Sequence, residues 1–153
     1  MKGVLFMISI IPQLDCNKIK QSIVLSLMEK IKTNKDTAFE IDEYGNTLLH
    51  HAVRCDGAKD LIVTLVKCGV NLKAKNHQGN TALHIAAAHS AENAILLMRL
   101  GAKDNVINND ALLPEDIFHK AFPEKCWFDI MPKPKIIFKG SHYEIVSSPI
   151  NTR

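Results

Sequence analysis

The chain has 153 residues, a formal net charge of +3, 46% hydrophobic residues and 23% charged residues. This length suits one domain, and the ordinary globular mixture excludes a chain that is disordered throughout. No apolar run in the sequence reaches the ~20 residues that a membrane-spanning helix requires, so we predict no membrane span.

Basic and acidic residues are unevenly distributed along the chain. Residues 1–35 carry six basic against two acidic residues, residues 36–119 carry seven against eleven, and residues 120–153 carry six against three. None of these stretches has the dense lysine and arginine clusters that bind nucleic-acid backbones. We therefore exclude nucleic acid as a partner.

The four cysteines indicate whether the protein resides in a reducing or an oxidising compartment. No two of them form a C-x-x-C pair, which excludes zinc ribbons, zinc fingers and thioredoxin-type motifs. Two disulfides are an alternative, but a chain of this size builds its core without such staples. We therefore predict reduced thiols in the cytoplasm at Cys16, Cys55, Cys68 and Cys126.

Residues 1–15 form a short apolar segment. Lys2 followed by the apolar run 4–11 is typical of a secretory signal, but no small-x-small cleavage site follows it. The alternative is a strand or helical turn that packs on the body of the protein, and we favour it.

The next stretch predicts an amphipathic helix, because apolar residues recur in it at helical spacing. Such a stripe also suits a membrane surface, but its polar face is only modestly basic, so we favour packing against the rest of the protein. The stripe consists of Ile19, Ile23, Val24, Leu27, Met28 and Ile31.

An internal repeat occupies the middle of the chain. The block Gly45–Val53 recurs as Gly79–Ala87, at an offset of 34 residues. An aliphatic helical pattern follows each block and stops at Gly69 in the first unit and at Gly101 in the second. Two helices are therefore predicted in each unit.

The repeated block resembles the ankyrin repeat, whose mark is Thr-Pro-Leu-His-x-Ala at a period near 33 residues. Here Leu48 and Ala82 replace the motif prolines. The resemblance implies an all-α solenoid of three to four helix-turn-helix units. The motif positions are Thr47, Leu49, His50, Gly69, Thr81, Leu83, His84 and Gly101.

Each motif residue has an expected structural role. Gly45 and Gly79 are expected in tight turns with positive φ, and the two helix-ending glycines in left-handed caps. The motif threonines open the first helices, and the motif leucines are buried. In the resembled family, the threonine and histidine side chains bond each other and the neighbouring loop.

A degraded third unit follows the two clear ones. Pro114 restores the motif proline, where a first helical turn tolerates it, while Asp116 and Phe118 replace the motif histidine and alanine. A bulky Phe118 suits a terminal unit with no further neighbour, and we predict a closing helix at residues 115–122.

The resemblance thus divides the chain into a capping repeat at 16–41, ankyrin repeats at 42–75 and 76–107, a degenerate capping repeat at 108–122 and an extension at 123–153.

The C-terminal extension has a different character. The β-prone stretches 136–138 and 143–146 flank Lys139–His142, which predicts a short hairpin. Upstream of it, Trp127 and Phe128 are predicted to plug the end of the core.

An enzyme with chemistry in this extension is the alternative hypothesis for function. Cys126 with His119 or His142 could supply a nucleophile and a base, but no sequence feature activates the thiol. The chain has no glycine-rich phosphate loop, no His-Glu-x-x-His motif and no metal-ligand spacing. We therefore predict no enzyme activity, no metal and no cofactor.

A binding surface is the favoured function. The resemblance implies a monomeric chain that binds a partner protein on a concave face of turn tips and first helices, as adaptors, inhibitors and bacterial or viral effectors do. Tyr44 and Arg54 are the predicted anchors, and the acidic residues Asp42 and Glu43 favour basic groups at the partner's rim. The alternative is that these are simply solvated turn positions. The candidate residues are Glu43, Tyr44, Asn46, His51, Arg54, His77, Gln78, Asn80, Ile85 and His89.

Overall fold

The computed structural model describes residues 21–133, 135–139 and 142–146, so the expectations for residues 1–15 and for Cys16 lie outside it. The described elements are α2 (Gln21–Thr33), a 3-10 helix η3 (Lys35–Phe39), α3 (Leu48–Ala52), α4 (Lys59–Lys67), α5 (Ala82–His89), α6 (Ala91–Arg99), α7 (Pro114–Ala121), α8 (Trp127–Ile130), β1 (Lys135–Lys139) and β2 (His142–Val146).

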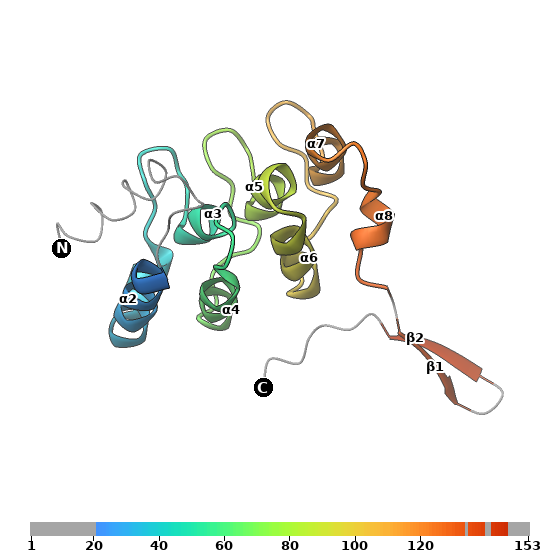
Figure 1. Cartoon of the computed structure of the whole chain (residues 1–153), viewed down its shortest axis with the longest axis horizontal. Coiled ribbons are helices and arrows are strands. Elements are labelled where there is room, and N and C mark those ends of the chain that lie inside the picture. The colour runs from blue at the N-terminus through green and yellow to red at the C-terminus, as the bar shows by residue number, and fades with distance from the viewer. Residues whose placement is uncertain (1–20, 134, 140–141, 147–153) are drawn as a thin grey trace.

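The helices form two rows. Figure 1 shows α3, α5 and α7 side by side in one row and α2, α4 and α6 in the other, with the connecting turns projecting together at one end of the stack. This arrangement confirms the predicted all-α repeat fold. Among the described residues, no helix is long and apolar enough to cross a membrane.

The helix ends lie where the repeat motif predicts them. Thr47 and Thr81 immediately precede the first helices of the two units in extended conformation. After the second helices, Gly69 has a φ of +88° and Gly101 a φ of +97°. A left-handed residue of this kind ends a helix and is most accessible to glycine.

Aliphatic residues from successive units form one continuous core. Leu49 and Leu83 are each only 1% exposed, as predicted, and the small side chains of Ala86 and Ala87 are fully buried in α5. On α2, Leu27 and Ile31 belong to the same core, which supports packing of this stripe over membrane binding.

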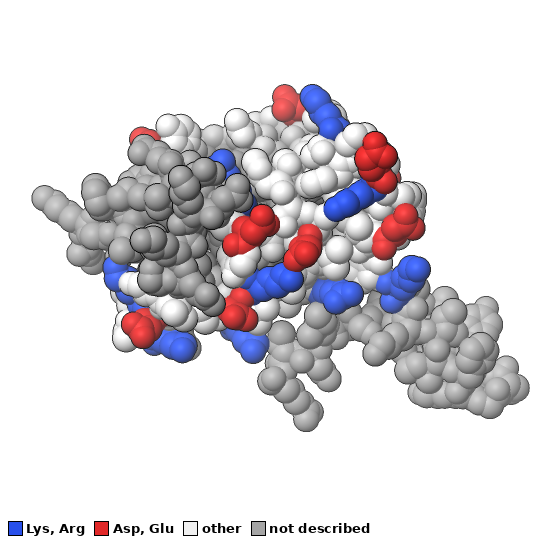
Figure 2. Space-filling model, in the orientation of Figure 1, with Lys and Arg blue, Asp and Glu red and all other residues white. Residues whose placement is uncertain are grey.

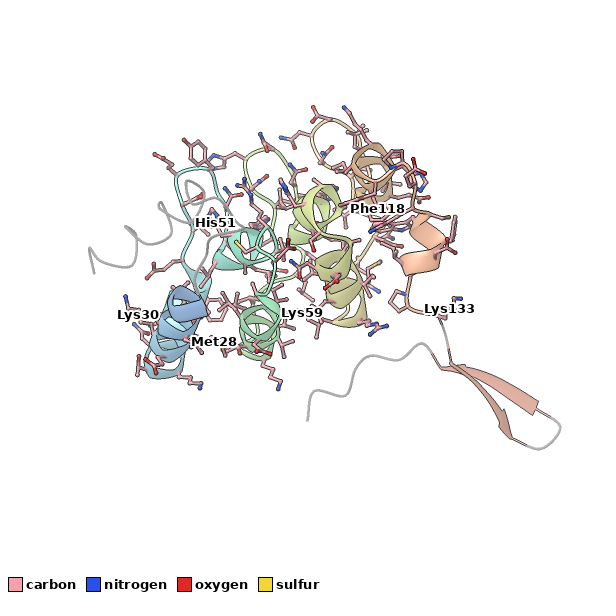
Figure 3. The ribbon with its side chains drawn as sticks, viewed as in Figure 1. Met28, Lys30, His51, Lys59, Phe118 and Lys133 are labelled. Atoms are coloured by element: carbon pink, nitrogen blue, oxygen red, sulfur yellow. The ribbon has the colours of Figure 1, made fainter. Side chains whose placement is uncertain are left out.

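Aromatic residues close the C-terminal end of the stack. Phe118 on α7 is fully buried (Figure 3), and its ring centroid lies 5.2 Å from that of Trp127 in an edge-on arrangement. Trp127 therefore plugs the core as predicted. The same prediction is wrong for Phe128, which is 68% exposed because α8 is a single turn and presents only one side to α7.

The predicted hairpin is also found. β1 and β2 pair in antiparallel register, with Lys135 opposite Val146 and Phe138 opposite Tyr143. Figure 1 shows this hairpin beyond the end of the helical rows, so the candidate surface described next is built without it.

Candidate binding surface

Each projecting turn is held by one carboxylate or amide side chain. In the first turn, Asp42 Oδ1 accepts from the backbone amides of Tyr44 (2.9 Å) and Asn46 (2.8 Å). Asn76 and Asn108 do the same in the second and third turns, each accepting two backbone amides at 3.0 Å. These side chains replace missing backbone partners and make the turns rigid.

Further hydrogen bonds join one turn to the next. Asn76 Nδ2 donates to Asn46 Oδ1 at 2.8 Å, and Asn108 Nδ2 donates to Asn80 Oδ1 at 2.9 Å. The backbone amide of His77 also donates to the carbonyl of Tyr44 at 2.9 Å. The turns therefore form a continuous ladder and not a row of independent loops.

The motif histidines connect each first helix to the following turn. His50 Nδ1 accepts from the backbone amide of Thr47 at 3.1 Å, and His50 Nε2 lies 3.0 Å from the carbonyl oxygen of Asn80. His84 is bonded in the same way, to Thr81 and to the carbonyl of Leu112. This confirms the stitching that the repeat resemblance implies, and it requires a neutral ring with the proton on Nε2.

Burial keeps these rings neutral. Burial lowers the pKa of His50 below its ordinary value of 6.5, and the neighbouring His51 lowers it further, against the opposing effect of the Asn80 carbonyl. Burial likewise lowers the pKa of His84, with a contribution from Lys75. The unfolded chain therefore binds protons more readily than the folded one.

This difference predicts that stability falls with acidification. Stability is complete above a pH of about 6.5, the unfolded pKa, and is lost as the pH falls toward the lowered folded pKa. We expect a lower urea midpoint at about pH 5.5 than at about pH 7.5. His84→Asn should reduce this pH dependence, whereas His119→Asn, at an exposed position, should preserve it. A midpoint that is unchanged between the two pH values would contradict the neutral-ring assignment.

His51 differs from its sequence-based expectation. It is only 1% exposed, not a solvated position, and its Nε2 lies 2.9 Å from Asp42 Oδ2. Burial would raise the pKa of Asp42, but the amides of Asn46 and Tyr44 and the His51 ring hold it below 3.8. Asp42 therefore stays ionised, and its hydrogen bonds are made within the protein.

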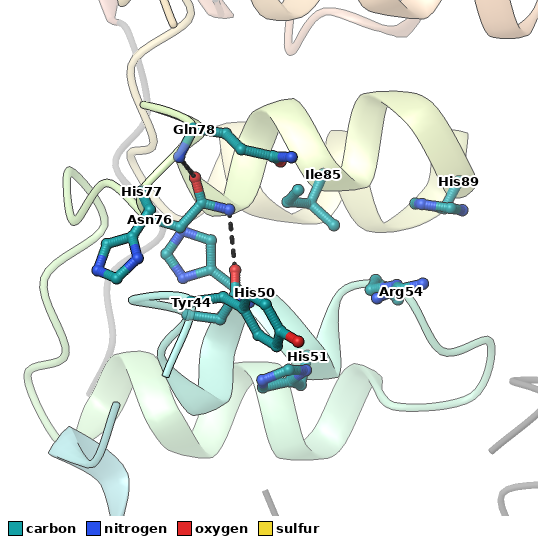
Figure 4. A pocket seen from close by; sticks show the side chains of 10 residues that line it. Tyr44, His50, His51, Arg54, Asn76, His77, Gln78, Ile85 and His89 are labelled. Carbon is teal, nitrogen blue, oxygen red and sulfur yellow. Dashed lines mark hydrogen bonds between the residues drawn. The ribbon is translucent and has the colours of Figure 1, made fainter. Parts of the chain in front are cut away.

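A cavity of about 390 Å³ lies between the first and second units. In Figure 4, side chains of α5 face those of α3 and of the segment after it across this cavity. The cavity brings together eight of the ten candidate residues, but not Glu43 and Asn80. Its lining consists of Tyr44, Asn46, His50, His51, Arg54, Asn76, His77, Gln78, Ile85 and His89.

Sequence reasoning missed several polar residues that build this surface. Asn76 and Asn108 hold their turns as Asp42 holds the first one. Each of these three residues lies three positions before the turn glycine, or before the alanine that replaces this glycine in the third turn. That recurrence was a usable signal. Asn93 was not detectable in this way: its buried Nδ2 donates to the carbonyls of Val53 (2.9 Å) and Cys55 (3.2 Å), contacts that span about forty positions.

The residues of the enzymatic alternative are not brought together by any described contact. Cys126 is exposed just before α8, while His142 lies on β2, whose side chains are outside the description. Among the described residues, no three His, Cys, Asp or Glu side chains form a group that could hold a metal ion. The Cys126–His142 pair thus stays a hypothesis.

Comparison with known proteins gives a family model and several relatives that match this chain. A family model of ankyrin repeats, in three copies, matches residues 15–109. The chain is 42% identical over 69 residues to the tyrosine-protein kinase Shark of Drosophila melanogaster. It is 31% identical over 64 residues to a putative ankyrin repeat protein of fowlpox virus, and 33% identical over 95 residues to human protein phosphatase 1 regulatory subunit 27.

These matches are partial on both sides. They cover 44%, 41% and 61% of this chain and 7%, 14% and 61% of the respective relatives.

Proposed function

Because the chain belongs to the ankyrin-repeat family, whose members are generally non-catalytic protein-interaction modules, we propose that it binds a partner protein through the cavity and the turn tips around it. It acts as an adaptor, inhibitor or effector that performs no chemistry itself, as a monomer in the cytoplasm. One of its relatives is a phosphatase regulatory subunit and another is viral, and both classes of protein are compatible with this role.

The observation that carries the proposal is the convergence of side chains from two adjacent units on one cavity. Tyr44, at 62% exposure, stands at its rim, and Arg54 lines it. Tyrosine and arginine are the residues in which interfaces concentrate binding energy. The rigid ladder beneath them means that little conformational freedom is lost when a partner docks.

A double substitution tests this proposal. Tyr44→Ala combined with Arg54→Ala should weaken partner binding by about 2 kcal/mol or more if both are anchors. The measurement is capture of partners from a cell lysate with the full chain as bait, followed by titration of the captured protein. The urea midpoint of the double variant serves as the folding control, since Tyr44 is 62% exposed and Arg54 is only half-buried, so the variant should stay folded.

The C-terminal hairpin is the competing docking site, and a truncation separates the two. The truncated chain should end at Lys133, so that Trp127 keeps its buried position in the core. We expect it to bind the partner as the full chain does. If the truncated chain folds but loses binding while the double variant binds normally, the proposed surface is wrong.

A further inference from the structure

Much of the hydrogen-bonding capacity around the cavity is already used inside the protein. Asn76 donates to Asn46 and accepts two backbone amides, as the dashed lines in Figure 4 show in part. Asn46 Nδ2 donates to Asp42 at 3.1 Å, and both nitrogens of His50 are bonded. These three lining residues therefore support the cavity but have little left to offer a ligand.

The capacity that remains includes one buried acceptor, Nδ1 of His51, but donors outnumber it. Gln78 Oε1 accepts from Asn80 Nδ2 at 3.2 Å, which leaves the Gln78 amide hydrogens available. The Nε–H of Arg54 is buried and has no hydrogen-bond partner, and its guanidinium group offers further donors but no acceptor. A group rich in acceptors is therefore the best complement to this cavity.

The charged residues around the cavity also favour an acceptor-rich group. No aspartate or glutamate lines it, and the nearby Asp42 is occupied by His51 and the turn amides. Burial lowers the pKa of His89, and the positive charge of Arg54 lowers it further, so this ring is neutral at pH 7. Arg54 is thus the lining residue that carries a full charge, and neither of the ion pairs between described residues includes it.

The face of the molecule shown in Figure 2 has no larger basic area among its described residues. In the view of Figure 2, basic and acidic side chains alternate over the described surface and form no continuous basic area. On this face, a partner is therefore not attracted by a continuous basic area.

We propose that this cavity receives a carboxylate side chain, from an aspartate or glutamate of the partner protein, which accepts hydrogen bonds from the Arg54 guanidinium group. The proposal rests on the proposed function and adds the chemistry of the partner to it. It replaces the basic partner expected from the turn sequence, because neither Asp42 nor Glu43 lines the cavity.

The experiment uses three matched peptides and the full chain. The probes are acetylated, amidated Ala-Ala-Xaa-Ala-Ala pentapeptides in which Xaa is Glu, Gln or Lys, titrated into the ¹⁵N-labelled protein at low salt and about pH 7. Glutamate and glutamine have the same shape, so a difference between them reports the charge. We expect the Glu peptide to bind at least about fivefold more tightly than the Gln peptide, with shifts at the Gln78 and Ile85 amides.

Two arginine variants locate the effect. Arg54→Gln should reduce the Glu-to-Gln preference to within about twofold, whereas Arg99→Gln, on the exposed part of α6, should leave it unchanged. If Arg54→Gln does not fold, Arg54→Lys replaces it and should lower the preference, because lysine lacks the planar fork that pairs with a carboxylate.

Several results would overturn the proposal. They are equal affinities for the Glu and Gln peptides, tighter binding of the Lys peptide, no binding of the Glu peptide up to about 10 mM, and a preference that survives in the Arg54 variant or is lost equally in the Arg99 variant. These failures are distinct from failure of the proposed function, in which partner capture itself would not depend on Tyr44 and Arg54.

Discussion

Replacing Leu83 with alanine is expected to lower the free energy of unfolding by about 2–5 kcal/mol. The side chain is 1% exposed in α5, the central helix of its row in Figure 1. Removing three heavy atoms there loses their burial and leaves a cavity. Because each unit of a repeat array is held only by its neighbours, the whole helical stack should melt earlier, which urea denaturation followed by circular dichroism would measure.

The matched control for this substitution is Leu25→Ala. Leu25 also lies in a helix, α2, but its side chain is 55% exposed, so the change should shift stability by no more than about 0.5 kcal/mol. Equal midpoints for the Leu83 variant and the wild-type chain would contradict the assignment of Leu83 to the core.

Gly79→Ala is the second substitution with a large expected effect. Gly79 has a φ of +75°, and a left-handed conformation costs an alanine about 1–2 kcal/mol. A Cβ at this position would also lie 2.7 Å from the backbone nitrogen of Asn109 in the next turn, and such overpacking adds about 1–3 kcal/mol. We therefore expect a loss of about 2–5 kcal/mol in the free energy of unfolding.

Two further substitutions separate the causes. Gly101→Ala meets the same backbone cost at a φ of +97°, but its Cβ has nothing within 4 Å, so it should lose only about 1–2 kcal/mol. Ala111 occupies the corresponding turn position of the third unit with a φ of +57°, so Ala111→Gly should stabilise the protein by up to about 1 kcal/mol. If both glycine-to-alanine variants lose the same amount, close approach between turns is not what Gly79 provides.

Most of the helical architecture could be predicted because the repeat motif is local. Thr47 and Gly69 mark the ends of one unit within a short window, and the same pattern recurs about 34 positions later. Trp127 could be assigned to the core from its apolar neighbourhood, but Phe128 beside it could not be assigned correctly, since adjacent residues of one helical turn point in different directions.

The candidate surface could be predicted only in part, because its chemistry depends on contacts between distant residues. The motif identified Tyr44 and Arg54 as variable positions, and the structure brings both to the cavity. It did not indicate that Asp42 is occupied by His51 nine residues away. The sequence favoured basic groups on a partner because of Asp42 and Glu43, but neither residue lines the cavity, whereas Arg54 does.

The hydrogen-bonded ladder between the turns also makes the units non-interchangeable. Each bond runs backward, from an asparagine amide in one turn to the turn before it, and Asp42 has no amide hydrogen with which to do the same. A duplicated copy of residues 76–107 placed after itself would find both a donor and an acceptor in register. If a copy of residues 42–75 were placed after residue 107, the carboxylate of its Asp42 would face the side-chain oxygen of Asn80, and neither group could donate a hydrogen bond. The array therefore has a prescribed order and can be lengthened by internal duplication only through its middle unit.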